Sequence, residues 1–142
     1  MEQMEVRTEF APAEFASVEE IQRQRLLFQD MPLMTQMVDA VSDILLVLNR
    51  ERQMVYANQS LYHTLGIRNE DTQRVFGCRP GEILKCAHAF ESEGGCGTTT
   101  FCSTCGAIKA ILSSQENRAD VQECRIIQDQ TGDALDLRVW AK

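Results

Sequence analysis

Apolar residues recur at helical spacing in the N-terminal third of the chain, with polar residues between them. Ser17 followed by Glu20 has the spacing of a capping box, which predicts a helix start. Pro32 interrupts the pattern and predicts a break. The apolar stripe comprises Val18, Ile21, Leu26, Phe28, Met31, Met34, Met37, Val38 and Val41. We therefore expect a helical segment over residues 17–41, after a mobile lead-in over residues 1–16, which shows no periodicity.

This stripe has two possible uses. It could pack on the domain that follows, or it could form the seam of a homodimer with a second copy of the chain. The stripe is short and broken once, so it does not predict a long coiled coil.

The rest of the chain alternates between strand and helix patterns. Short apolar runs rich in β-branched residues predict strands, and capping residues and glycines mark the helices. The predicted elements are strands at 44–48 and 53–57 around a turn at 49–52, a helix at 59–65 between Asn58 and Gly66, short helical turns at 69–85, a helix at 107–114, and strands at 121–128 and 135–141 around a turn at 130–133. This order predicts an α+β domain over residues 42–142.

Composition narrows the class of protein. A chain of 142 residues has the length of one domain, and its formal charge of −7 with scattered Lys and Arg argues against a nucleic-acid partner. No stretch approaches the roughly 20 apolar residues of a membrane span, and the N-terminus has neither a basic start nor an apolar run. We expect a cytoplasmic protein, where clustered cysteines favour metal binding or redox chemistry over structural disulfides.

Four cysteines and one histidine fall within residues 85–106, among glycines that let the backbone wrap a small object. Cys102 and Cys105 form a Cys-x-x-Cys pair just ahead of the predicted helix, where the positive helix end favours thiolates. Cys96 lies between two glycines and Cys86 ends the preceding helical region, so the four sulfurs could bind one metal or cluster. His88 could replace one sulfur or take an outer position.

Three interpretations of these cysteines are open. They could hold zinc or an iron-sulfur cluster, between which the spacing does not decide. Cys102 and Cys105 could instead switch between dithiol and disulfide, or the set could be ordinary buried thiols. Cys78 and Cys124 are separate in sequence, and we interpret both as small apolar residues inside the fold.

Several strings carry a resemblance to a known family. They are Asp43-Ile-Leu-Leu-Val-Leu-Asn-Arg, Val55-Tyr-Ala-Asn-Gln-Ser-Leu, Gly77-Cys-Arg-Pro-Gly-Glu, Cys86-Ala-His-Ala, Gly95-Cys-Gly-Thr, Cys102-Ser-Thr-Cys-Gly, Glu123-Cys-Arg-Ile and Ala134-Leu-Asp-Leu-Arg-Val-Trp-Ala. From about residue 35 the chain resembles the PAS sensory domain, and more narrowly the cysteine-bearing PAS input module of bacterial sensor histidine kinases. The resemblance implies an antiparallel sheet with short helices on one face, and a last strand beyond Lys142.

This resemblance implies a role in two-component signal transduction. The domain would sense redox state or a diatomic gas through its cysteine-bound cofactor and pass that state to a downstream kinase or other effector. No phosphoacceptor helix or ATP-binding domain is present in the sequence, so we expect no enzyme activity from this chain, which would be a piece of a longer histidine kinase. The alternatives are a thiol-disulfide redox protein using Cys102 and Cys105, and a zinc-stapled dimerisation module.

Overall fold

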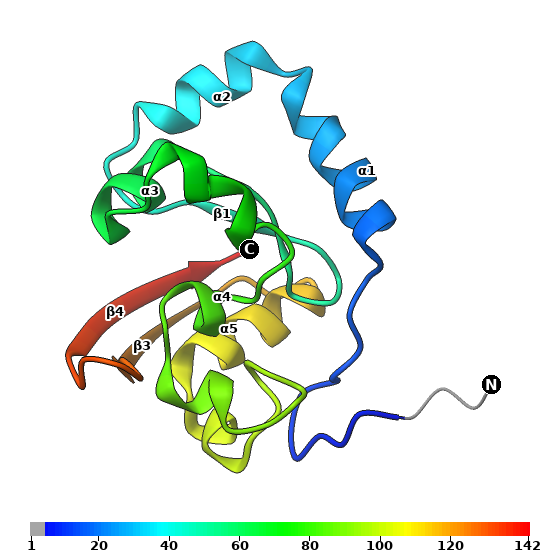
Figure 1. Ribbon diagram of the computed structural model, residues 1–142, viewed down its shortest axis with the longest axis vertical. Coiled ribbons are helices and arrows are strands. Elements are labelled where there is room, and N and C mark those ends of the chain that lie inside the picture. The colour runs from blue at the N-terminus through cyan, green and yellow to red at the C-terminus, as the bar shows by residue number, and fades with distance from the viewer. Residues whose placement is uncertain (1–4) are drawn as a thin grey trace. The chain divides into compact units, whose positions relative to one another are not determined.

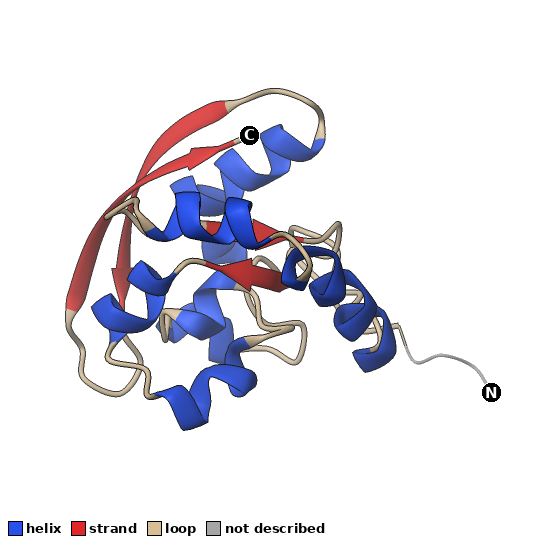
Figure 2. Ribbon diagram, turned by 90° about the horizontal axis from the view of Figure 1, so that it is seen from above, coloured by secondary structure: helices blue, strands red, loops and turns tan. Residues whose placement is uncertain are grey.

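The computed structural model describes residues 5–142 as two compact units. Unit 1 combines the segment that ends at Glu14 with Pro80–Lys142, and unit 2 is Phe15–Arg79. Both units contain helices and antiparallel strands, which confirms the α+β class (Figure 2). In the described residues the strands pair as two separate two-stranded sheets, one in each unit.

Unit 2 begins with the two helices that the apolar stripe predicts. Helix α1 is Val18–Gln29, and the Ser17 hydroxyl accepts the N–H of Glu20 as the capping box requires. Helix α2 is Pro32–Asp39, so the break falls at Pro32 (Figure 1). Most of the stripe is exposed, and its exposed members are Val18, Leu26, Met31, Met37 and Val41. Leu27 and Leu33, beside the stripe, are exposed as well.

The hairpin of unit 2 joins β1 (Leu46–Leu48) to β2 (Met54–Ala57), followed by α3 (Gln59–Leu65) and the 3₁₀ helix η1 (Asn69–Val75). Gly66 ends α3 in the left-handed conformation with φ of 64°, as its sequence predicts. Asn58 precedes α3, but the expectation that its side chain caps this helix is wrong. Its buried amide instead accepts the N–H of Leu45 and donates to two carbonyls, which ties α3 to the chain before β1.

Unit 1 is built around a long hairpin and one helix. Strands β3 (Asp120–Ile127) and β4 (Ala134–Ala141) pair along their whole length, and Gly132 turns the chain between them with φ of 71°. Helix α5 (Gly106–Gln115) packs on β3, as Figure 1 shows in yellow and orange. Between Pro80 and α5 lie three short elements, α4 (Pro80–Ile83), η2 (Ala87–Phe90) and η3 (Thr100–Thr104).

The N-terminal segment of unit 1 runs along the loop that precedes η3. The backbone N–H groups of Glu9 and Ala11 donate to the carbonyls of Thr98 and Gly97, and Ala11 and Ala13 are buried. Residues 1–4 of the predicted lead-in lie outside the described residues. No helix of residues 5–142 combines the length and apolar character that crossing a bilayer requires.

Candidate functional site

Five of the six cysteines lie in unit 1, and all six are free thiols. Cys78 lies in unit 2, where its half-buried thiol contacts the carbonyl of Arg74 at 3.4 Å. The five cysteines of unit 1 come from four places in the chain: before η2, the loop after it, η3 with the start of α5, and strand β3.

The structure places the sulfurs of Cys105 and Cys124 next to each other. Their Sγ atoms are 3.5 Å apart and share a hydrogen bond. Cys105 is the residue that precedes the first turn of α5, and Cys124 is in the middle of β3. Cys124 is buried and Cys105 is half-buried, so the pair is largely shielded from solvent.

Gly106 explains how a helix can start so close to a strand. A Cβ atom on Gly106 would lie 2.1 Å from the carbonyl oxygen of Glu123, far inside van der Waals contact. Only the missing side chain lets the first turn of α5 rest directly on the β3 backbone. Cys105 and Cys124 flank this contact in sequence, and their sulfurs meet because of it.

The environment of Cys105 stabilises its thiolate. The hydrogen bond from the Cys124 thiol is the largest cause that lowers the Cys105 pKa to about 6, against the opposing effect of burial. The N–H groups of Ile108 and Ala107, at the start of α5, add to the lowering. The same shared proton raises the pKa of Cys124, so ionisation of the pair favours the thiolate on Cys105.

Cys102 is buried beside a different group. Its Sγ lies 3.3 Å from the hydroxyl of Thr99, and its side chain packs in a small apolar cluster with Ala11 and Ile108. The backbone N–H of Cys105 donates to the carbonyl of Cys102 at 3.1 Å, so the Cys-x-x-Cys segment is a tight 3₁₀ turn. The hydrogen-bond partner of the Cys105 sulfur is thus Cys124 on β3, whereas the Cys102 sulfur lies beside Thr99.

Burial and nearby backbone N–H groups act in opposite directions on the pKa of the other two predicted ligands. Burial raises the pKa of Cys86, while the nearby N–H groups of His88 and Ala89 act against this. Burial raises the pKa of Cys96 to about 12, opposed by the N–H of Gly81. Gly81 permits this approach because a Cβ there would lie 2.7 Å from the Cys96 sulfur.

Charge on any one of these sulfurs affects the others. Charges on Cys102 and Cys105 would raise the pKa of both Cys86 and Cys96. Such effects act over several ångströms, so the four predicted ligands share one region of unit 1. Gly95 and Gly97, on either side of Cys96, have φ values of 73° and 93°, which confirms that the backbone turns there.

His88 contacts Glu91 and Phe101 as well as lying near the cysteines. Its Nδ1 lies 2.9 Å from Glu91 Oε1, and its ring stacks on Phe101 with centroids 4.2 Å apart. A positive charge on His88 would lower the pKa of Cys105, which places the imidazole within electrostatic reach of the sulfur pair. The position of His88 therefore suits an outer group that adjusts the charge around the cysteines.

The fit of this region to a metal can be tested from its sulfur positions. Two thiolates on one tetrahedral zinc, with bonds of about 2.3 Å, lie about 3.8 Å apart, and the 3.5 Å of Cys105 and Cys124 is close to that spacing. Within residues 5–142, however, no three Cys, His, Asp or Glu side chains are placed together closely enough to bind one ion. As placed, the sulfurs fit a dithiol pair, and a four-thiolate site would require the loop cysteines to move towards it.

Cys124 is the site residue that sequence reasoning missed. It is buried, as expected for a small apolar residue, but it also contacts Cys105. One sequence signal was available, since alternation along β3 puts Gln122, Cys124 and Ile126 on the same, more buried face. Comparisons with protein-family models, curated proteins and solved structures find no match to this chain.

Proposed function

We propose that this chain is a redox-sensing input domain of PAS type, normally attached to a histidine kinase or another effector of a bacterial signalling protein. The resemblance of its motifs to cysteine-bearing PAS modules supports the sensory role. The order of its elements, two paired strands, short helices, one longer helix and two paired strands, agrees with that resemblance. We further propose that the cysteines of unit 1 carry the signal.

The single observation that carries this proposal is the 3.5 Å separation of the Cys105 and Cys124 sulfurs. A disulfide needs about 2.05 Å, so a shift of roughly 1.5 Å would join them. With a peroxide as oxidant, the Cys105 thiolate attacks one oxygen, an S–O bond forms and the O–O bond breaks to release hydroxide. The Cys124 thiol then attacks the Cys105 sulfur, the S–S bond forms, and the oxygen leaves as water with the thiol proton.

A bound metal or iron-sulfur cluster is the second candidate, and the backbone N–H groups near the sulfurs favour it. Backbone N–H groups near Cys86, Cys96 and Cys105 act to lower the pKa of each thiol, which favours the thiolate form that a metal ligand requires. Zinc would supply a structural crosslink, and an iron-sulfur cluster would supply sensitivity to oxygen, nitric oxide or redox state. In either case these three cysteines with Cys102 would be the ligands and His88 an outer group.

The test begins with the full chain purified without oxygen. Its absorption spectrum, iron, acid-labile sulfide and zinc are measured, and hydrogen peroxide is then added before alkylation and peptide mapping. We expect a Cys105–Cys124 disulfide in the parent chain and in Cys102→Ser, and none in Cys124→Ser. Cys78→Ser, in unit 2, is the matched control and should behave as the parent does.

Other outcomes would redirect the assignment. A Cys102–Cys105 disulfide that persists in Cys124→Ser would show that the sequence neighbours are the redox pair. Brown protein with iron and sulfide, or stoichiometric zinc, would establish the metal candidate, and Cys102→Ser should then lose most of that metal because a hydroxyl is a poor soft-metal ligand. Unmodified thiols together with an absence of metal would refute the redox function.

A further inference from the structure

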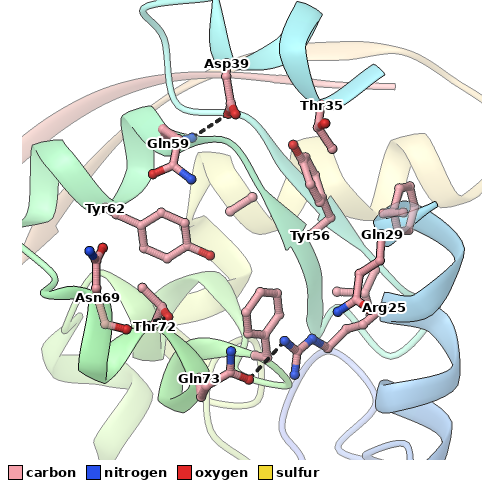
Figure 3. A pocket seen from close by; sticks show the side chains of 14 residues that line it. Arg25, Gln29, Thr35, Asp39, Tyr56, Gln59, Tyr62, Asn69, Thr72 and Gln73 are labelled. Atoms are coloured by element: carbon pink, nitrogen blue, oxygen red, sulfur yellow. Dashed lines mark hydrogen bonds between the residues drawn. The ribbon is translucent and has the colours of Figure 1, made fainter. Parts of the chain in front are cut away.

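Unit 2 contains a cavity of about 430 Å³ that is lined by its own residues alone, none of them a cysteine. Its walls come from α1, α2, β2, α3 and η1 (Figure 3). This volume lies within the range of roughly 300–1,000 Å³ that small-molecule sites occupy. The lining contains one guanidinium and one carboxylate, contributed by Arg25 and Asp39.

Arg25 is held in place but has no counter-charge. Its guanidinium carbon lies 3.6 Å from the ring centroid of Phe76, and its Nη2 donates to Gln73 Oε1 at 3.0 Å. Within residues 5–142 it forms no ion pair. A guanidinium has five N–H donors, so donors remain for a bound anion, and the ring and amide fix their direction in advance.

Two tyrosines supply further donors and flat apolar surface. The ring of Tyr56 stacks on Phe28 with centroids 5.5 Å apart, and Tyr62 is buried. Neither hydroxyl has a hydrogen-bond partner among the described residues. Burial raises the pKa of Tyr62, so its hydroxyl stays protonated at neutral pH and can donate to an acceptor.

Asp39 gives the cavity a second polar end. Its Oδ1 accepts the backbone N–H of Gln59 at 2.9 Å, which fixes the carboxylate at the start of α3. In Figure 3, Asp39 and Arg25 lie on different sides of the cavity, with the rings of Tyr56 and Tyr62 between them. Positive charge, aromatic surface and negative charge thus follow one another across the cavity.

We propose that this cavity binds a small aromatic carboxylate, with the carboxylate on Arg25 and Tyr62 and the ring between the two tyrosines. An Arg–carboxylate contact is often bidentate, and a half-buried guanidinium that forms no ion pair within residues 5–142 is suited to it. A ligand with an amino group opposite its carboxylate would gain a contact with Asp39. The domain would then receive a chemical input in unit 2 as well as a redox input in unit 1.

Three probes of nearly equal shape test the charges separately. They are 4-methylbenzoate, 4-(aminomethyl)benzoate and 4-methylbenzylamine, titrated into the full chain while amide NMR shifts and heat are recorded. We expect both carboxylates to shift amides of β2 and α3, with 4-(aminomethyl)benzoate the tighter binder. The amine that lacks a carboxylate should not bind.

Variants identify the residues involved. Arg25→Gln should weaken carboxylate binding about tenfold or more, because a charge-assisted hydrogen bond is lost. Arg23→Gln is the matched control on the same helix, since its exposed side chain pairs with Glu20, and it should bind as the parent does. Tyr62→Phe removes one hydroxyl and keeps the ring, so it should weaken binding less and provides a second test if Arg25→Gln does not fold.

The proposal is overturned by any of three results. These are no amide shift with either carboxylate, equal binding of 4-methylbenzylamine and 4-methylbenzoate, and equal effects of Arg25→Gln and Arg23→Gln in folded protein. The cavity is in unit 2, so none of these results bears on the thiol chemistry of unit 1.

Discussion

Replacement of Gly106 by Ala tests whether close packing of α5 on β3 creates the thiol pair. The new Cβ would lie 2.1 Å from the Glu123 carbonyl oxygen, whereas nonbonded carbon and oxygen atoms need more than 3 Å. The neighbour is strand backbone and cannot swing aside. The start of α5 must therefore move away from β3 by about 1 Å, and the Cys105 sulfur would move with it.

Two opposing energies decide the sign of the stability change. Alanine favours a helix over glycine by about 0.5 to 1 kcal/mol. Overpacking against a rigid neighbour costs about 1 to 3 kcal/mol. The clash is severe, so we expect a net loss of about 1 to 2 kcal/mol in the free energy of unfolding. Urea denaturation of the reduced protein measures this loss.

The thiol readout separates local displacement from general destabilisation. With the hydrogen bond from Cys124 lost, the pKa of Cys105 should rise towards its ordinary value, and peroxide should form the disulfide more slowly. Gly132→Ala is the control, because nothing lies within 4 Å of its new Cβ and only backbone strain of about 1 kcal/mol results. The reasoning fails if Gly106→Ala keeps the parent stability and Cys105 reactivity.

Three further predictions concern the ionisation of Cys105, the exposed face of α2 and the response of residues 95–104 to oxidation. Alkylation of Cys105 should stay fast from pH 9 down to pH 7 and slow only near pH 6, because the lowered pKa keeps the thiol ionised at neutral pH. In Cys124→Ala the alkylation rate should begin to fall at a higher pH, and a rate profile equal to that of the parent chain would contradict the prediction. If the exposed apolar face of α2 joins two copies in a homodimer, Leu33→Glu should halve the mass that sedimentation measures, and Gln36→Glu should leave it unchanged. Equal masses for the parent chain and both variants would exclude this seam. Oxidation should alter hydrogen exchange in residues 95–104 and leave the β3 and β4 amides unchanged; the opposite distribution would refute this prediction.

Local signals in the sequence predict most of the helices and turns. The Ser17 cap, the break at Pro32 and the left-handed Gly66 all depend on residues within four positions of the feature, and all are confirmed. Asn58 has the right position for a helix cap but bonds Leu45, Val38 and Asp43, 13 to 20 residues away. Because the Asn58 amide is buried, it must find hydrogen-bond partners inside the fold, and spacing along the chain cannot reveal these distant partners.

Contacts between residues far apart in the sequence also explain why the thiol pair was not predicted. Spacing correctly indicates that Cys86, Cys96, Cys102 and Cys105 share one region, because a 22-residue glycine-bearing loop carries them all. It favours Cys102 as the redox partner of Cys105, since the two are adjacent in a familiar motif. The contact with Cys124 spans 19 residues and depends on how α5 packs on β3. Gly106 is the residue that permits this packing, and its role is visible only once the strand lies beside it.

The two sulfurs of the proposed switch differ in how freely they can move. Cys124 lies within eight paired residues of β3 and β4, and displacement of one strand residue would break ladder hydrogen bonds on both sides. Cys105 follows a five-residue 3₁₀ helix and the turns at Gly95 and Gly97, which change shape by small backbone rotations. Contraction of the S–S distance by roughly 1.5 Å should therefore move Cys105 and the loop behind it. That loop also carries Cys96 and Cys102, so formation of the disulfide would rearrange the other thiols. Because Cys105 belongs both to the disulfide and to the proposed ligand set, metal binding and disulfide formation would be mutually exclusive states of one site.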